Sequence, residues 1–498
     1  MTLNIYWIGL CVLVPLVALV AGHQVILRPF QAAKPEKAVN THDADAEAFR
    51  KTFLRVYLLV MGSEWLQDPY MYSLFRDEKA LDERTVAALY VTTYISAAVS
   101  AFLTGYMADR FGRRAACLVY CGIHSLASVS VKFDAVGILI AGRALGGVGL
   151  NLLWTVFESW MVTEYNARAL DQSSFPLSAM FGVMTKYNCM TAIIAGVLGH
   201  CIVRVLGSKT DPFMVGVGLD VCAALLMLWT WNENRGAVVQ ASIHDGDDPY
   251  NGIPDESLIE RTTAALKDPR IWVLSFDSCC FEGTIFIFKF FWPGTLQAAH
   301  DEERPGNDST TPYGVVFATF MAAMVLGAIL FNFSTRNGKL ATVDQASTWR
   351  ATSPTLLLGA ALFASALSFL IAGVAKAELH LFLSFLLLEF CNGVYVPSMA
   401  YHRGTIVNDS GRTLIYGLMN IPLFVFVIAA IYTTSSDGAE HRHIVFLFSA
   451  VLLLVAVLAI ALGLGLSNIR SGFSPVSSRE VDDAESGGKV ELRSDGVD

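Results

Sequence analysis

The stretch Gly105-Tyr106-Met107-Ala108-Asp109-Arg110-Phe111-Gly112-Arg113-Arg114 joins two apolar runs of the chain. Its glycines permit a tight turn, and its aspartate and arginines are suited to pair with each other or to cap the neighbouring helix ends. The stretch lies between the second and third of twelve apolar segments that follow a first one at the N-terminus. A shorter echo, Thr335-Arg336-Asn337-Gly338-Lys339, lies between the eighth and ninth. These matching positions indicate two related halves of six helices each.

The composition places these helices in a bilayer. Hydrophobic residues make up 54% of the chain and charged residues 16%, whereas soluble domains have about 45–50% and about 25%. We therefore expect an all-α membrane protein with two six-helix bundles and one additional N-terminal transmembrane helix. After a first span at Ile5–Ile26, hydropathy predicts spans near 52–75, 85–107, 115–132, 135–160, 177–203, 213–231, 271–297, 313–333, 354–375, 379–402, 413–434 and 444–466.

The polar segments divide the chain into parts. The first segment lacks a basic start, so we interpret it as an uncleaved span and not as a signal peptide. The expected parts are the extra helix at 1–30, a cytoplasmic linker at 31–51, the N-terminal bundle at 52–231, a cytoplasmic loop at 232–269, the C-terminal bundle at 270–466 and a disordered cytoplasmic tail at 467–498.

Basic residues set the expected orientation. Most of the 35 Lys and Arg lie on the side of the Asp109–Arg114 loop, which favours a cytoplasmic position for that side. An odd number of spans then puts the N-terminus outside and the C-terminus in the cytoplasm, with the sequon Asn307-Asp308-Ser309 outside. The tail carries no retrieval signal, so we expect the plasma membrane. The nine cysteines lie in apolar segments, which argues against a metal site, and no basic cluster indicates nucleic acid as a partner.

Several motifs resemble one known superfamily. The Gly105–Arg114 loop and Gly142–Gly147 resemble signatures of the major facilitator superfamily, and Glu64–Tyr70, Phe157–Trp160 and Phe281–Phe288 resemble its molybdate-anion transporter family. Leu388–Cys391 and Tyr395–Ser398 add to that resemblance. It implies a monomeric carrier that imports molybdate by alternating access. It also implies a gating role for the residues of the loop, namely Gly105, Asp109, Arg110, Gly112 and Arg113.

Ionisable residues inside the predicted spans are the candidate functional groups. Each costs roughly 2.5–3.5 kcal/mol at mid-bilayer, so we expect it to face a cavity or a partner. At 1.5 Å per residue, Glu64, Lys186, Glu282 and Glu389 lie near the midplane, and Arg143 and Lys289 lie closer to the outer surface. One polar stripe is predicted on the span at 135–160, formed by Arg143, Gly147, Asn151, Trp154 and Glu158.

These groups suggest two kinds of site. For a dianionic oxyanion, the expected ligands are Arg143, Lys186, Lys289 and Asn151, because cations and amides donate hydrogen bonds to oxygen. For proton coupling, the expected carriers are Glu64, Asp68, Glu282 and Glu389. The alternative is internal pairing, of Arg143 with Glu64 or Glu158 and of Lys289 with Glu282, and the carboxyl groups would then only hydrogen-bond between helices. His124 and His200 are expected to be packing histidines.

Other functions remain open at this point. A carrier of a sugar or an organic anion, and a nutrient sensor that does not transport, both fit the span pattern. Molybdate, sulfate and tungstate share shape and charge, so the sequence does not separate them. An enzyme is not expected, because the chain has no phosphate-binding Gly-x-x-x-x-Gly-Lys loop and no Gly-x-Ser-x-Gly elbow. No cofactor is expected either.

Overall fold

The computed structural model describes residues 5–26, 41–170, 177–234, 267–304, 311–336, 354–406, 422–431 and 438–465. All regular secondary structure within these ranges is helical, which confirms the expected all-α membrane fold. Eight helices within them are long and apolar enough to cross a bilayer. Large apolar side chains remain exposed on the outer surface, for example Val205 at 80% and Trp229 at 81%. Such extensive apolar exposure fits a surface covered by lipid.

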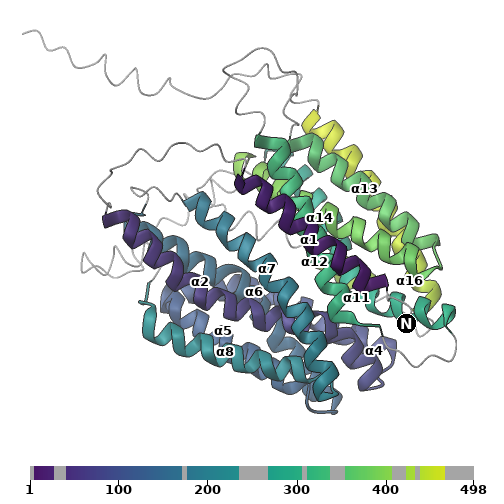
Figure 1. Cartoon of the computed structure of the whole chain (residues 1–498), viewed down its shortest axis with the longest axis horizontal. Helices are drawn as coiled ribbons and strands as arrows, with labels where there is room; N and C mark the ends of the chain where they lie inside the picture. The colour runs from purple at the N-terminus through teal and green to yellow at the C-terminus, as the bar shows by residue number, and fades with distance from the viewer. Residues whose placement is uncertain are drawn as a thin grey trace, which may run out of the picture.

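The helices of the two halves of the chain gather into two neighbouring bundles (Figure 1). Three short helical turns extend α2, namely η1 (Asp68–Tyr70), α3 (Met71–Ser73) and η2 (Leu74–Glu78). The helices of the first bundle are α2 (Thr41–Gln67), α4 (Glu83–Phe111), α5 (Arg113–Ser130), α6 (Val136–Ala167), α7 (Leu177–Leu206) and α8 (Asp211–Thr230).

The second bundle is built from the second half of the chain. Its fifth helix, expected at 413–434, is described only from Pro422 to Ile431, and the rest of that range lies outside the described residues. The other helices are α11 (Pro269–Glu303), α12 (Tyr313–Arg336), α13 (Pro354–Val374), α14 (Glu378–Ile406) and α16 (Gly438–Ile460), followed by the turn η4 (Ala461–Gly465).

Helix α2 begins earlier than its hydropathy predicts. Its first residue is Thr41, inside the range expected as a linker, while the apolar stretch begins near residue 52. The intervening Ala46–Lys51 segment contains alanine, glutamate, arginine and lysine, which are good helix formers in water. The helix therefore continues beyond the apolar stretch, so that hydropathy locates the span but not the start of the helix.

Glycines bring corresponding helices of the two halves into close contact. In the first bundle α4 packs against α6, where a Cβ atom at Gly147 would overlap the carbonyl oxygen of Thr93. In the second bundle α12 packs against α14, where a Cβ atom at Gly393 would overlap the carbonyl oxygen of Met324. Both pairs join the second and fourth helices of their halves. The internal repeat indicated by the loop sequences is therefore also present in the helix packing.

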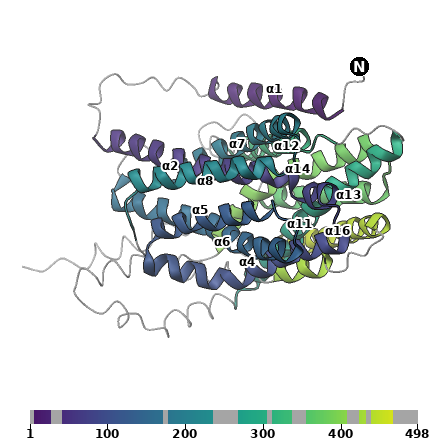
Figure 2. The same cartoon turned by 90° about the horizontal axis from the view of Figure 1, so that it is seen from below.

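The additional N-terminal helix α1 (Ile5–Ile26) lies outside the bundles, against α12 (Figure 2). The hydroxyl of Tyr6 donates a 2.7 Å hydrogen bond to Oε1 of Glu378 on α14. A Cβ atom at Gly9 would lie 3.1 Å from the ring of Phe382. The ring of Trp7 contacts the imidazole of His200 on α7, at 5.7 Å between centroids. Helix α1 therefore covers the junction of the two bundles near its own N-terminal end.

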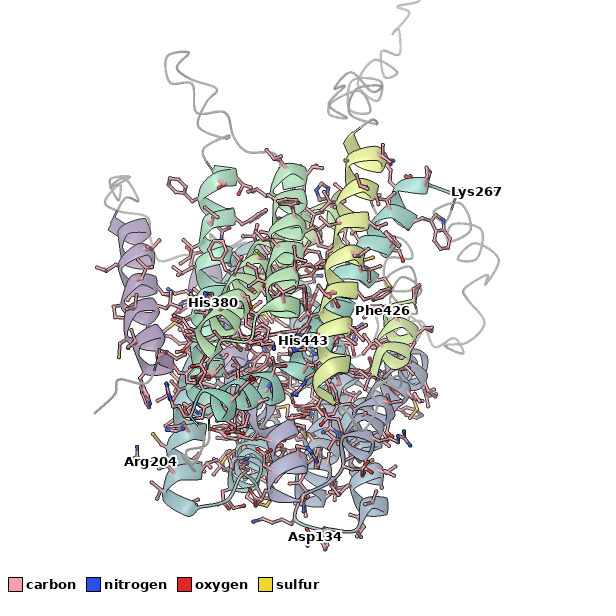
Figure 3. All side chains as sticks on the ribbon, turned by 90° about the vertical axis from the view of Figure 1, so that its right-hand side faces the viewer. Asp134, Arg204, Lys267, His380, Phe426 and His443 are labelled. Atoms are coloured by element: carbon pink, nitrogen blue, oxygen red, sulfur yellow. The ribbon has the colours of Figure 1, made fainter. Side chains whose placement is uncertain are left out.

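The helix connections define two ends of the molecule, which we name the Gly112 end and the Asp134 end. At the Gly112 end, the α4–α5 turn binds the segment after α8, since the N–H of Arg113 donates to the carbonyl oxygen of Asn234 at 2.9 Å. At the Asp134 end, Lys79 pairs with Asp134 at 2.7 Å. Figure 3 shows Asp134 at the bottom of the view, Arg204 at the lower left and Lys267 at the upper right.

The two bundles meet toward the Asp134 end. The hydroxyl of Tyr313 on α12 donates to Asp77 at 3.3 Å, and Asp77 also pairs with Lys209 at 2.7 Å. The ring of Phe290 on α11 packs edge-on against Tyr90, at 4.9 Å between centroids. Helices α7 and α12 also cross closely. The Asp134 side is therefore held together by polar, aromatic and backbone contacts.

Candidate functional site

A cavity of about 850 Å³ lies between the bundles. It is lined by side chains of α2, α4, α5, α6, α8 and α11 and of the segment Pro422–Ile431. The predicted polar stripe of α6 forms one wall, because Arg143, Asn151, Trp154 and Glu158 all line the cavity. The remaining member of the stripe, Gly147, packs against α4 instead. The spacing of the sequence thus correctly predicts which face of α6 is polar.

Arg143 points its guanidinium group at this cavity without an acidic partner. Its Nε donates to Oγ1 of Thr93 at 3.0 Å, and its Nη1 donates to Sδ of Met71 at 3.3 Å. Among the described residues no carboxylate oxygen lies within 4.0 Å of it, and no acceptor is found for Nη2. The internal pairing with Glu64 or Glu158 that the sequence left open is therefore not formed. Arg143 retains hydrogen-bond donors for a group in the cavity.

Lys289 lies opposite, on α11, and is only loosely paired. Its Nζ is 3.6 Å from Oδ2 of Asp68, so its partner is not Glu282, the residue considered from the sequence. The same Nζ lies 5.7 Å from the ring centroid of Trp65, within cation–π range. Side-chain exposure of about one third for both Lys289 and Asp68 leaves room for another ligand. The pair joins the first helix of one bundle to the first helix of the other.

Glu282 also lines the cavity, but its partner comes from a helix end. Nη2 of Arg403 on α14 donates to Oε1 of Glu282 at 2.8 Å and to the hydroxyl of Ser278 at 2.5 Å. The hydroxyl of Tyr395 donates to the same carboxylate at 3.2 Å. The span predicted by hydropathy ends at residue 402, so Arg403 is not among the predicted intramembrane partners, whereas α14 continues to Ile406. The signal available in the sequence was a basic residue directly after an apolar run.

A second polar group extends from the cavity into the first bundle. His124 on α5 lies between two carboxylates, with Nε2 at 3.1 Å from Oε2 of Glu64 and Nδ1 at 2.7 Å from Oδ2 of Asp220. Asp220 is on α8 and is completely buried, whereas Glu64 and His124 line the cavity. His124, expected from the sequence to be a packing residue, therefore belongs to an ionisable group, and Asp220 is a member that the sequence prediction lacks. An aspartate ten residues into an apolar helix was the signal for it.

Two of the expected site residues lie away from the cavity. Lys186 is exposed on α7, and its Nζ lies 5.9 Å from the ring centroid of the adjacent Tyr187. Glu389 is buried in the second bundle, where its Oε2 accepts a 3.0 Å hydrogen bond from Nδ2 of Asn392. The cavity therefore contains Glu64, Asp68, Arg143, Asn151, Glu282 and Lys289 of the expected set.

Asn151 lines the cavity but uses its amide nitrogen to hold two helices together. Its Nδ2 donates to the hydroxyl of Ser100 at 2.8 Å and to the carbonyl oxygen of Ala97, both on α4. The side-chain donors that an oxyanion would need are thus already engaged. Among the described residues no group of His, Cys, Asp and Glu is arranged to hold a metal ion.

The turn of the loop motif is built around Gly112. This residue has φ of 116°, in the region that favours glycine, and a Cβ atom there would overlap the carboxylate of Glu233. That carboxylate accepts the backbone N–H groups of Arg114 and Ala115, at 2.8 and 3.1 Å. A carboxylate at the start of a helix compensates its unpaired N–H groups. Glu233 therefore joins the end of α8 to the start of α5.

Of the other motif residues, Arg113 has a described side chain. Nη1 of Arg113 donates to the carbonyl oxygen of Ser159 at 3.1 Å and to Oγ1 of Thr163, which fastens the turn to α6. The backbones of Gly105, Asp109 and Arg110 belong to α4. The side chains of Asp109 and Arg110 lie outside the described part of the structure.

The chain is similar in sequence and in fold to known membrane transporters. A family model described as sugar transporters with twelve transmembrane segments matches residues 10–347. The molybdate-anion transporter of Takifugu rubripes is 27% identical over 477 residues, which cover 90% of this chain and 93% of the relative. That of Danio rerio is 27% identical over 443 residues, covering 83% and 86%. An auto-inhibited peptide transporter of the POT family has the same fold, with a TM-score of 0.63 at 12% identity, covering 87% of this chain and 98% of the other.

Proposed function

The chain belongs to the major facilitator family described as sugar transporters with twelve transmembrane segments, and we propose that this member imports molybdate together with protons. The observation that carries the proposal is the guanidinium of Arg143, which faces the cavity while no described carboxylate lies within 4.0 Å of it. A guanidinium donates two parallel hydrogen bonds to the oxygens of an oxyanion. The names of the curated relatives support the same substrate.

A sugar is the second candidate substrate. The family description favours it, and so do Trp65 and Trp154, which line the cavity and offer flat surfaces for a sugar ring. A neutral sugar, however, would leave the free donors of the Arg143 guanidinium without a charged acceptor, since no described carboxylate lies within 4.0 Å of it. An oxyanion supplies such an acceptor through two parallel hydrogen bonds. The oxyanion therefore fits the donors of Arg143 better.

Protons are part of the proposal because the charges require them. Importing a dianion against 100 mV, negative inside, costs about 4.6 kcal/mol, at about 2.3 kcal/mol per charge. The cavity is lined by four carboxyl groups, Glu64, Asp68, Glu158 and Glu282, and by two permanently basic residues, Arg143 and Lys289. A dianion enters such a site more easily when carboxyl groups are protonated. We therefore expect molybdate affinity to rise as the pH falls.

We assign this conformation to the inward-facing state of an alternating-access cycle. The contacts between the bundles described above lie toward the Asp134 end, whereas the cavity wall extends along α6 to Glu158 and Ser159, toward the Gly112 end. We place the Gly112 end in the cytoplasm, in keeping with its excess of basic residues. In the opposite state the Asp77–Tyr313 contact would open and the α4–α5 turn would approach the second bundle.

The orientation makes a prediction for the sequon Asn307-Asp308-Ser309, which lies outside the described residues. We propose a monomer in the plasma membrane with the N-terminus outside and the loop at 232–269 in the cytoplasm. The 305–310 connection would then face the secretory lumen during synthesis and receive a glycan. Expression in animal cells should give a band that shifts on glycosidase treatment and is lost in Asn307→Gln. If the wild-type band does not shift and a tag placed after residue 498 is stained on intact cells, the protein has the opposite orientation.

Uptake of labelled molybdate tests the substrate directly. In cells that lack their own importer, we expect saturable uptake that rises as the external pH is lowered from 7.5 to 6. Excess unlabelled glucose should not compete, and excess tungstate should. If the protein reaches the surface but uptake equals that of untransfected cells, the oxyanion proposal is wrong. Competition by sugars in a binding assay with the purified protein would then favour the second candidate.

A further inference from the structure

The group Glu64–His124–Asp220 has a feature that the transport proposal does not use. Both imidazole nitrogens of His124 lie within hydrogen-bond distance of a carboxylate oxygen, at 3.1 Å and 2.7 Å. The three residues come from three different helices, with Glu64 on α2, His124 on α5 and Asp220 on α8. The exposed side-chain fraction falls from 27% for Glu64 to 9% for His124 and 0% for Asp220. The group is thus accessible to water at Glu64 and buried at Asp220.

Counting protons identifies the state that this geometry represents. A hydrogen bond between a ring nitrogen and a carboxylate needs one proton, so two such contacts need two protons. A neutral imidazole between two ionised carboxylates has only one. The second contact would then place a nitrogen lone pair against a carboxylate oxygen, which is repulsive. The observed geometry is therefore that of the proton-loaded group, and loss of one proton must break one contact.

The contact to Glu64 is the one that breaks. It is the longer of the two, and Glu64 reaches the water-accessible cavity, whereas Asp220 is enclosed. Ser63 and Ser125 also lie near the group, with their hydroxyls at 3.4 Å from Nδ1 of His124 and from Oδ2 of Asp220.

A released Glu64 carboxylate faces the basic residues of the cavity. Lys289 and Arg143 line the same cavity and their charges act on Glu64. The other titratable or charged groups around the unit are Asp68 near α2, Tyr120 and Cys121 on α5, Glu158 on α6 and Glu282 on α11.

We propose that His124 is the proton-binding residue of the transport cycle and that it acts by holding Glu64 away from Arg143 and Lys289. This inference rests on the proposed oxyanion transport. With the proton bound, Glu64 is retained by His124 and the two bases are available to the anion. When the proton leaves toward the cavity, Glu64 becomes a competing intramolecular anion and weakens anion binding. Proton and anion are thereby bound together and released together.

Two substitutions should have opposite effects on molybdate affinity. In Glu64→Gln the competing carboxylate is absent, so sodium molybdate should bind at every pH about as tightly as it binds wild type at low pH. In His124→Gln nothing retains Glu64 by charge, so binding should be as weak at every pH as in wild type at high pH. In both variants the slope of log Kd against pH should fall by about one, because one proton fewer is bound with each anion. Titration of the purified full-length protein between pH 5.5 and 8.5 measures this.

His200→Gln changes a histidine of α7 that does not line the cavity, and it should keep the wild-type slope. A purely structural role for the group predicts that Glu64→Gln and His124→Gln both weaken binding. That outcome, or an unchanged slope in His124→Gln, overturns the inference. If His124→Gln aggregates, Asp220→Asn replaces it and should move the transition in affinity to lower pH.

A measurement without molybdate separates this inference from the proposed function. An infrared difference spectrum between pH 5.5 and 8.5 should contain carboxylate and imidazole bands that disappear in His124→Gln and persist in His200→Gln. If wild type binds no molybdate but shows these bands, the substrate proposal fails and the proton-binding role stands. If the bands are unchanged in His124→Gln, the proton-binding role is wrong whatever the substrate.

Discussion

Arg143→Ala is expected to reduce saturable molybdate uptake by roughly 100-fold or more, the largest effect of any single side chain in the cavity. Loss of one partner from a shielded, hydrogen-bonded charge pair costs about 2–5 kcal/mol, and about 1.4 kcal/mol corresponds to a factor of ten. Arg143 fits that case because its guanidinium faces the cavity and bonds only Thr93 and Met71 among the described residues. Initial uptake rates at several molybdate concentrations, normalised to surface protein, measure the loss.

Two further variants identify the cause of that loss. Arg143→Lys keeps the charge but not the planar fork, so it should retain part of the activity, about a tenth of wild type. Lys186→Ala removes a basic residue that is also inside the membrane but is exposed on α7, away from the cavity, and it should transport like wild type. Uptake by Arg143→Ala within threefold of wild type would show that the guanidinium does not bind the anion.

Gly196→Val is expected to reduce transport by more than tenfold while the protein still reaches the membrane. Helices α7 and α12 cross here, and a Cβ atom at Gly196 would lie 2.6 Å from the carbonyl oxygen of Gly314 and 3.0 Å from the backbone nitrogen of Ala318. Backbone atoms on a packed helix cannot turn aside as a side chain can. Valine would therefore hold the two bundles apart and oppose the conformation that is closed toward the Asp134 end. Uptake per surface molecule is the measurement.

The same helix provides the matched control. A Cβ atom at Gly182 on α7 meets nothing within 4 Å, so Gly182→Val has the same change in helix propensity without the clash. We expect its uptake to stay within twofold of wild type. Overpacking costs typically 1–3 kcal/mol, so thermal unfolding of the purified variants shows how much of the Gly196→Val effect is stability. Equal transport by the two valine variants would mean that the crossing does not limit the cycle.

Much of the architecture follows from the sequence because hydropathy is a local property. An apolar run of about 20 residues is long enough to span a bilayer, and a helix satisfies its backbone polar groups there. The polar face of α6 was also predictable, since Arg143, Asn151, Trp154 and Glu158 recur at helical spacing on a single element. The position of the turn at Gly112 was predictable from a few consecutive residues, whereas its contacts with Glu233 and Ser159 come from distant parts of the chain.

The ion partners were decided only by the tertiary structure. From the sequence, Lys289 had Glu282 as its nearest candidate, seven residues away on the same helix. In the structure Lys289 approaches Asp68, and Glu282 is bound by Arg403. Each of these pairs joins two helices. The direction of successive side chains turns by about 100° per residue around a helix. Whether two side chains meet therefore depends on how each helix is rotated about its axis and on how far it is shifted along its neighbour.

The same rotations decided which charged residues reach the cavity. Lys186 and Glu389 are as deep in their spans as Glu64, yet one points outward from α7 and the other into the second bundle. The Glu64–His124–Asp220 group requires three helices from distant parts of the chain to converge on one imidazole. The sequence by itself determined the membrane fold, its two halves and the polar face of α6. Only helix packing decided which charges meet, because depth in the bilayer is a property of one segment and a contact is a property of two.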